Sequence, residues 1–392
     1  MFDALEPKPA DPLLAIIGMF AADDRESKID LGVGVYKDPA GITPVMASVK
    51  AAERQLLEEQ TSKSYVGLVG DVEYVALMQR LAFGAAGVQR QDRTVGLQTT
   101  GGSAALRLGA DLIYASRPDA TVWLGDPSWD NHAPILDAVG CPTVHYEYFN
   151  VAQQTLQFDT MMDALSRAKA GDVVLLQGCC HNPTGSDLST KQWLAVADLC
   201  CAQGLIPFID VAYQGLGVGL EQDLEGVNLL LEQVPEALVT LSCSKNFGLY
   251  RERTGALYVQ CESAAHKAAA ASNLLAIART SYSMPPDHGA SVVRTILQDE
   301  ELTQQWQREL SEMQQRIAAT RAQLVTALGQ QHSYLVEQKG MFSTLALTPE
   351  AILGLREEHA IYMAGSGRIN VAGFRGDEIE RFASVVGELI DR

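Results

Sequence analysis

The chain has 392 residues, of which 47% are hydrophobic and 20% charged, and its formal net charge is -18. This length exceeds the ~250 to 300 residues at which a single core stops growing, so we expect two domains. The negative charge argues against a nucleic-acid partner, and no run approaches the ~18 apolar residues that a membrane span requires.

The seven cysteines include two adjacent pairs but no C-x-x-C, and the seven histidines show no convincing ligand spacing. Neither a disulfide framework nor a metal site is indicated, and a reducing cytoplasm fits this composition. Asp3, Glu6 and Asp11 precede the apolar patch from Leu13 to Phe20, where a secretory signal would carry positive charge. We therefore expect a cytoplasmic protein without a bound metal.

The N-terminal part opens with a helical pattern from Pro12 to Ala22, which suits either an arm laid across another subunit or a floppy terminus. Gly32 and Gly34 then interrupt an apolar run, which permits either a close ligand contact or a structural bulge. Helices are expected at 45–60 and 70–83. A further helix opens with small residues near Gly101 and continues to residue 114. Its N-terminus with Ser103 is either a phosphate seat or an ordinary N-cap.

From residue 121 onward, apolar runs alternate with polar turns and helical patterns, which indicates βαβ units and a mainly parallel sheet. The apolar runs lie at 121–124, 173–176, 206–209 and 238–241. Trp129, Asn182, Asp210 and Lys245 each follow one of them. Each residue alone has an ordinary explanation, but ligands bind at the carboxyl ends of parallel strands. Their clustering therefore predicts one site.

Lys245 is expected in a turn at the end of a buried strand. Burial lowers the pKa of an amine and yields the neutral nucleophile that Schiff-base chemistry needs. Ser242, Ser244, Arg251 and Arg253 flank it and could hold a phosphate. A lysine, a phosphate cradle and a strand end together suggest pyridoxal phosphate, and the alternative is a surface lysine in a polar loop.

The C-terminal part is expected to contain a strand at 255–260 and helices at 264–281, 299–328 and 349–359. The two prolines at 285 and 286 follow the first of these helices. Arg368 comes after a glycine in a strand-like run, where it could bind a planar anion or form a surface ion pair.

Together these motifs resemble the class I aminotransferases of PLP fold type I, in the aspartate and aromatic amino acid branch. The resemblance covers nearly the whole chain. Its most specific segments are C-H-N-P-T-G from Cys180, D-V-A-Y-Q-G from Asp210, S-C-S-K-N-F-G-L-Y from Ser242 and S-G-R-I-N-V-A-G from Ser366.

The resemblance implies an α/β fold in which a large domain holds a mainly parallel seven-stranded sheet between helices, beside a smaller α/β domain. It implies an N-terminal arm and part of the small domain at 1–37, the large PLP-binding domain at 38–310 and the small C-terminal domain at 311–392. It also implies a homodimer with shared active sites, which would account for the N-terminal arm.

The family roles, if they carry over, make Lys245 the residue that binds the cofactor covalently and moves the proton between substrate and cofactor. Asp210 would pair with the pyridinium nitrogen, with His132 behind its carboxylate. Asn182 and Tyr213 would hydrogen-bond the phenolic oxygen, and Lys245, Asp210 and Tyr213 form the predicted catalytic set.

Other residues are expected from the resemblance to contact the cofactor or the substrate. Trp129 would stack on the cofactor ring, and its phosphate would be held by Gly102, Ser103, Ser242 and Arg253, joined by Tyr65 from the partner subunit. The predicted substrate-binding residues are Gly34, Trp129, Asn182, Arg279, Phe342 and Arg368, of which Arg368 would hold the α-carboxylate. A buried arginine is tolerated when its guanidinium pairs with a carboxylate, whereas either charge buried alone would be destabilising.

Arg279 matches the family arginine that crosses the interface to bind the side-chain carboxylate of aspartate or glutamate. Ser103, however, stands where threonine is usual, and Ser64 and Met284 stand where asparagines are usual. These exchanges remove polar groups or bulk and would ease the entry of an aromatic ring. Gln177 replaces a histidine that is familiar in its stretch.

We therefore predict an aminotransferase that passes amino groups from tyrosine, phenylalanine and aspartate to 2-oxoglutarate by a ping-pong mechanism. A strict aspartate aminotransferase is the main alternative, because positions 35, 37 and 43 look like those of the aspartate enzymes. A lyase or decarboxylase with the same cofactor is more remote, since Arg279 and Arg368 together suit an exchange between an amino acid and a dicarboxylic keto acid.

Two readings outside these enzymes find little support in the sequence. The glycine runs at 32–34 and 215–219 do not form G-x-G-x-x-G between a strand and a helix, which argues against a nucleotide-binding dehydrogenase. An effector-binding regulator that joins this fold to a DNA-binding arm is disfavoured, because no such arm is found and the chain is acidic.

Overall fold

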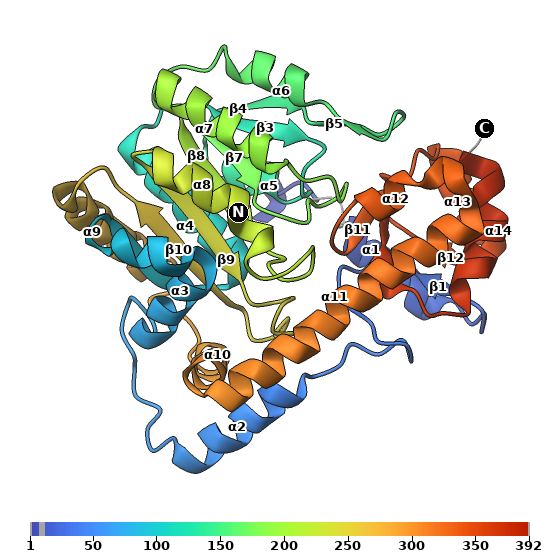
Figure 1. Ribbon diagram of the computed structural model, residues 1–392, viewed down its shortest axis with the longest axis horizontal. Helices are drawn as coiled ribbons and strands as arrows, with labels where there is room; N and C mark the ends of the chain where they lie inside the picture. Colours follow the sequence, from blue (N-terminus) through green and yellow to red (C-terminus); the bar gives the residue numbers. More distant parts are fainter. Residues whose placement is uncertain (1, 8–11, 391–392) are drawn as a thin grey trace.

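The computed structural model describes residues 2–7 and 12–390. Residues 1, 8–11, 391 and 392, which fall within the expected arm and the expected C-terminal domain, lie outside this description. A seven-stranded sheet in the order β2-β10-β9-β8-β7-β3-β4 forms the centre of the fold (Figure 1). Its strands are β2 (Thr94–Thr100), β3 (Val122–Asp126), β4 (Thr143–Glu147), β7 (Val173–Gln177), β8 (Ile206–Val211), β9 (Ala237–Ser242) and β10 (Thr254–Gln260). Among these strands β10 alone runs opposite to the others, so the predicted mainly parallel sheet is confirmed.

The middle strands are buried on both faces, which explains their continuous apolar runs. Because successive side chains point to opposite faces, Val173 and Leu175 enter the core beneath α4 (Gly101–Ser116). Val174 and Leu176 enter the other core, beneath α7 (Thr190–Gln203) and α8 (Glu225–Gln233). The same alternation places Gln177, at the end of β7, on the α4 face.

Helices cover both faces of the sheet (Figure 1). With α4 lie α5 (His132–Val139) and α9 (Ala264–Ser281), and α3 (Val72–Gln89) packs on β2 and near α8. The helix expected at 264–281 is confirmed, whereas the one expected at 70–83 runs on to Gln89 through a kink at Gly84. Among the described helices, none is long and apolar enough to cross a membrane.

A second group of elements lies apart from the sheet, and α11 (Glu300–Leu328) connects the two (Figure 1). One end of α11 packs with α2 (Ala47–Glu59) and α10 (His288–Gln298). The second group comprises α12 (Tyr334–Glu337), β11 (Phe342–Thr344), α13 (Pro349–His359), β12 (Ile361–Tyr362), β13 (Arg368–Asn370) and α14 (Glu378–Ile390). The helices expected at 299–328 and 349–359 are thereby confirmed.

The N-terminal segment joins this second group. β1 (Ile29–Asp30) pairs in parallel with β12, and β11 pairs antiparallel with β13. The loop after β1 is held by Asn370, whose Nδ2 donates to the carbonyls of Val33 and Val35 at 2.6 and 2.7 Å. This places Gly34 beside β13. The remaining elements are short: α1 (Pro12–Ala22), β5 (Phe149–Asn150), β6 (Thr155–Leu156), α6 (Phe158–Leu165), η1 (Phe2–Ala4), η2 (Gln91–Arg93), η3 (Gln222–Leu224), η4 (Gln330–His332) and η5 (Val371–Gly373).

Candidate active site

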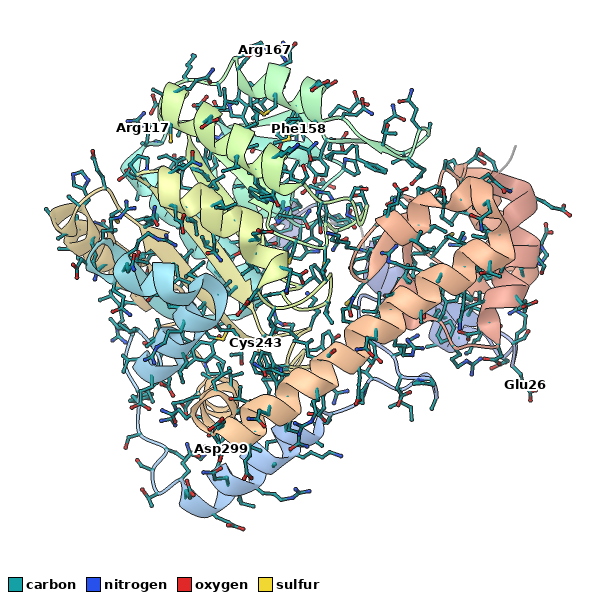
Figure 2. All side chains as sticks on the ribbon, in the orientation of Figure 1. Glu26, Arg117, Phe158, Arg167, Cys243 and Asp299 are labelled. Carbon is teal, nitrogen blue, oxygen red and sulfur yellow. The ribbon has the colours of Figure 1, made fainter. Side chains whose placement is uncertain are left out.

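A cavity of about 230 Å³ lies at the carboxyl ends of the parallel strands. Its walls come from the strand ends, the first turn of α4 and the loop after β9, where Figure 2 labels Cys243. The lining residues are Gly102, Ser103, Leu106, Trp129, Gln177, Asn182, Asp210, Ala212, Tyr213, Ser242, Ser244, Lys245 and Arg253. All the predicted cofactor contacts except Tyr65 are among them. A larger cavity of about 430 Å³ lies at the opposite edge of these strands and contains none of the predicted residues.

Asp210 is held from two sides at the end of β8. The strand register pairs it with Thr240, whose Oγ1 donates to Oδ1 at 2.7 Å. His132 Nε2 lies 3.1 Å from Oδ2, and its Nδ1 lies 2.8 Å from Ser128 Oγ. Because an ionised carboxylate only accepts hydrogen bonds, Nε2 must carry the proton that faces Asp210. Among the described residues, the one ion-pair partner of Asp210 is this buried histidine, so the carboxylate suits a cationic group in the cavity.

Lys245 lies half-buried in the turn after β9, with its Nζ 4.7 Å from the centre of the Tyr213 ring. Burial lowers the pKa of the Lys245 amine to about 8, the Asp210 charge opposes this shift, and Arg253 and Arg368 add to it. The turn is fixed from behind by Trp306, whose Nε1 donates to the Asn246 carbonyl at 2.8 Å. Lys245 is therefore a positioned amine that is half neutral near pH 8.

The first turn of α4 and Arg253 form a seat for an anion. The N-cap residue Thr100 makes no side-chain cap, so the first N–H groups of α4 lack that partner. Gly101 has a φ of +74°, and a Cβ added there would lie 2.5 Å from Arg253 Nη2, so only glycine lets the guanidinium come this close. With the hydroxyls of Ser103 and Ser242 lining the same wall, this arrangement suits a phosphate.

Arg368 lies beside this cavity with its side chain buried. It donates to Asn182 Oδ1 at 3.2 Å and to the Gly32 carbonyl at 3.0 Å, and its buried Nε has no hydrogen-bond partner. Burial lowers the pKa of Arg368, and no carboxylate forms an ion pair with it in the described part of the chain. An arginine with free donors and no anion is suited to bind a carboxylate.

Phe342 and Gly34 complete the surroundings of Arg368. The guanidinium carbon of Arg368 lies 4.6 Å from the centre of the Phe342 ring, which also meets the Tyr213 ring edge-on at 5.9 Å. A Cβ added at Gly34 would lie 3.1 Å from Phe342 Cζ. Asn182 joins the two sides, because its Nδ2 donates to Tyr213 Oη at 3.3 Å while its Oδ1 accepts from Arg368.

Tyr65 and Arg279 do not reach the cavity. Tyr65 is 92% exposed, in the loop between α2 and α3. Arg279 is exposed in the last turn of α9, where its Nη1 donates to Ser283 Oγ at 2.5 Å. The structure therefore separates these two predicted residues from the others.

Several residues of the site escaped the sequence analysis. Thr240 stood there only as part of an apolar run, although its position opposite Asp210 follows once the strand register is known. Ser128 fell in an unremarked turn before Trp129, and Gln177 was noted only as replacing a histidine. Gln177 accepts from Asn182 N and donates to Asn182 O, both at 2.8 Å, so it fixes the turn that carries Asn182.

One group of side chains in the described residues could in principle hold a metal ion, namely Cys179, Cys180 and Asp223. The oxygens of Asp223 already accept backbone N–H groups from the 215–219 loop. The hydrogen bond that Cys180 donates to Cys179, together with burial, raises the pKa of Cys180, which disfavours the thiolate that binds metals. The geometry therefore favours a structural cluster.

Comparison with known proteins adds to this geometry. The family model for "Aminotransferase class I and II" matches residues 26–386. A tyrosine aminotransferase of Rhizobium meliloti (strain 1021) is 50% identical over 386 residues, which cover 98% of each chain. An aspartate aminotransferase of Escherichia coli (strain K12) is 43% identical over 385 residues, 97% of each chain.

A solved structure is also closely similar. It is an aromatic-amino-acid aminotransferase from Burkholderia pseudomallei, described as covalently bound to pyridoxal phosphate. It is 38% identical and superposes with a TM-score of 0.96, covering 100% of this chain and 99% of that one.

Proposed function

The chain belongs to the class I and II aminotransferases, and on that premise we propose that it moves amino groups from tyrosine, phenylalanine and aspartate to 2-oxoglutarate. The predicted family, α/β fold and aminotransferase activity are thereby confirmed, with pyridoxal phosphate as the cofactor. The observation that carries the proposal is the cavity that Lys245, Asp210 and the anion seat share. Arg368 lies beside this cavity and has no carboxylate partner among the described residues.

The residues around the cavity fit pyridoxal phosphate. The first turn of α4, Ser103, Ser242 and Arg253 would hold its phosphate, and Asp210 would hold its protonated ring nitrogen. Asn182 and Tyr213 would hydrogen-bond its phenolic oxygen, and Trp129 would lie against its ring. When bound, the cofactor supplies an electron sink for the α-carbon of the substrate.

Lys245 is the residue that we assign to covalent attachment and proton transfer. Its lowered pKa keeps a large share of the amine neutral near pH 8, so that it can attack an aldehyde and then accept a proton from the substrate α-carbon. Asp210 stays fixed by Thr240 and His132, which keeps its charge directed at the cavity. Trp306 holds the loop of Lys245 and so limits the positions from which the amine acts.

Arg368 is assigned to the α-carboxylate of the substrate. Arg368 pairs with Asn182, and its Nε remains free to donate beside the cavity. A carboxylate bound there would stabilise a buried cation that otherwise lacks an ion-pair partner among the described residues. Phe342 and Gly34 would limit the space around that carboxylate. The substrate would thereby be oriented with its α-carbon toward Lys245.

We further propose a homodimer in which Tyr65 and Arg279 of one copy complete the site of the other. Both side chains are exposed in the single chain, although they match family site residues. The segment around Tyr65 also exposes large apolar side chains, namely Ile42, Val45, Leu57, Val66 and Val72. Several exposed large apolar side chains in one stretch of the chain support an interface there.

We also propose an N-terminal arm with part of the small domain at 1–37, a large domain at 38–310 and a small C-terminal domain at 311–392. The pairing of β1 with β12 supports an N-terminal contribution to the small domain, and α11 supports a connection near residue 310. We also propose a reducing, cytoplasmic location, which is supported by the seven free cysteines.

The decisive experiment is stopped-flow spectroscopy of the cofactor with tyrosine, phenylalanine and aspartate in turn. We expect a complete half-reaction with each amino acid and release of the corresponding keto acid. A half-reaction with aspartate alone would favour the strict aspartate aminotransferase, which Arg279 and the Escherichia coli relative support. Cofactor turnover without a keto acid product would contradict transamination.

A further inference from the structure

Arg321 is a buried arginine on α11 that no step above uses. Its side chain is 2% exposed, and no carboxylate forms an ion pair with it in residues 2–7 and 12–390. Burial lowers the pKa of Arg321 to about 10. Its donors bind instead to oxygen atoms of the chain around 335–343. The acceptors are Leu335 O at 2.9 Å, Lys339 O at 3.3 Å, Gly340 O at 2.8 Å, Phe342 O at 2.7 Å and Ser343 Oγ at 2.8 Å.

Apart from Leu335, which lies on α12, these acceptors belong to residues 339–343. This segment, called the 339–343 loop below, enters β11 at the substrate side of the site. Phe342 is the inward residue of this loop, and its ring packs on Arg368 and Tyr213. The hydrogen bond from Arg321 reaches the Phe342 carbonyl itself. The position of the Phe342 ring therefore depends on how Arg321 holds its backbone.

The same loop also contacts the turn that carries Asn182. Lys339 N donates to the Gly185 carbonyl at 2.7 Å. Thr344, the residue after the loop, donates from Oγ1 to the Pro183 carbonyl at 3.0 Å. A Cβ added at Gly340 would lie 2.3 Å from Cys180 Cβ, so loop and turn pack without spare room. A displaced loop would consequently move both Phe342 and Asn182, which contact the Arg368 side chain.

We propose that Arg321 is a positioning residue for the carboxylate-binding end of the site, and this rests on the proposed function of Arg368. The planar guanidinium carries five N–H donors in a fixed fork, which lets one side chain hold several carbonyls at once. A lysine has three donors on a single atom and cannot span the same acceptors. Arg321 thus sets the place of Phe342, and through it the orientation of Arg368.

The test compares Arg321→Met and Arg321→Lys with Arg316→Met. Arg316 lies on the same helix and also binds backbone carbonyls, those of Phe374 and Asp38, but it does not touch the 339–343 loop. The probe is 3-phenylpropionate, which has an aromatic ring and a carboxylate but no amino group. Its binding to the holoenzyme is followed by cofactor absorbance, together with kcat and KM for phenylalanine and the unfolding temperature.

We expect both Arg321 variants to bind the probe about tenfold to a hundredfold more weakly, with a matching rise in KM and a smaller change in kcat. Arg316→Met is expected to lose stability while keeping probe affinity within about twofold. Equal probe affinity in wild type and Arg321→Lys, or an equal loss in Arg316→Met, would overturn the proposal. Arg321→Lys decides the matter if Arg321→Met does not fold. A wild-type enzyme without a phenylalanine half-reaction would instead refute the proposed function.

Discussion

Two groups of predicted site residues differ in how a single chain places them. The inward group, exemplified by Asp210, Tyr213 and Lys245, surrounds one cavity between the sheet and α4. The outward pair, Tyr65 and Arg279, lies exposed at a loop and at a helix end. The inward residues follow buried strands whose register fixes them. Tyr65 instead lies in a loop, and Arg279 lies on the exposed side of α9, whose opposite side packs on the core through Leu274 and Ala278. We therefore expect one chain to supply most of the cofactor contacts. A second copy is expected to add Tyr65 at the cofactor phosphate and Arg279 at the substrate side chain.

The largest effect is expected from Lys245→Ala, which removes the centre of the inward group. Activity should fall by about 10⁴-fold or more, because both covalent attachment and proton transfer are lost. Borohydride reduction followed by peptide mapping should place the cofactor on Lys245 in the wild type. Lys50→Ala, which removes an exposed lysine on α2, is the control and should retain both label and activity. If the reduced cofactor were found on another residue of the wild type, Lys245 would not be the covalent attachment site and the proposed site would be wrong.

The outward pair is tested by Arg279→Leu and by mixing subunits. The single variant should lose about a hundredfold in kcat/KM for aspartate, because a carboxylate would lose its charged partner, and much less for phenylalanine. A hybrid of Arg279→Leu with Lys245→Ala contains one site with both native residues only if Arg279 acts across the interface. Random pairing in a two-fold dimer would then restore about a quarter of wild-type aspartate activity.

The control for this experiment is each variant mixed with itself, which should stay inactive toward aspartate. An equal mixture without any recovered aspartate activity would show that Arg279 acts within its own chain. In that case the inward and outward groups would belong to one subunit, and the exposed position of Arg279 would need a movement of α9 rather than a partner.

The same contrast explains what the sequence could predict. Asn182, Asp210 and Lys245 were placed at one edge because apolar runs identify buried strands, and parallel strands share their carboxyl edge. Thr240 and Ser128 escaped because their roles depend on strand register and on the path of α5, which no local pattern specifies. The fold class followed from the alternation of strands and helices.

Residues outside the sheet were harder to place from sequence. Arg321 stood within a predicted amphipathic helix, and nothing nearby in the sequence indicates that its acceptors lie at 335–343. The antiparallel position of β10 is also a matter of topology rather than composition. Tyr65 and Arg279 were identified only by family resemblance, because an exposed side chain leaves no burial pattern in the sequence.

A smaller effect concerns the pH dependence of the inward group. The pKa of Lys245 is lowered to about 8, so below that pH the neutral fraction falls about tenfold per unit, and above it the fraction levels off. The rate at which apoprotein incorporates pyridoxal phosphate should therefore rise with pH and level near 8, as measured by stopped-flow absorbance between about pH 6 and 10. Asp210→Asn removes a charge that favours the ammonium, so its midpoint should move to lower pH. A midpoint near that of an exposed lysine, about 10.4, would contradict the desolvation of Lys245.

The smallest effect is expected from Thr240→Val, which removes one hydrogen bond to Asp210 while keeping the shape of the side chain. A hydrogen bond to a charged group contributes about 1.5 kcal/mol at the lower end, so kcat should fall by about tenfold, and Thr240→Ser should stay within about twofold. Because Asp210 would act on the cofactor, phenylalanine and aspartate should be affected equally. Arg279→Leu should separate the two substrates instead. If Thr240→Val lowered the activity toward one substrate alone, the inward group would also contribute to the choice of substrate side chain. The division between the two groups would then not hold.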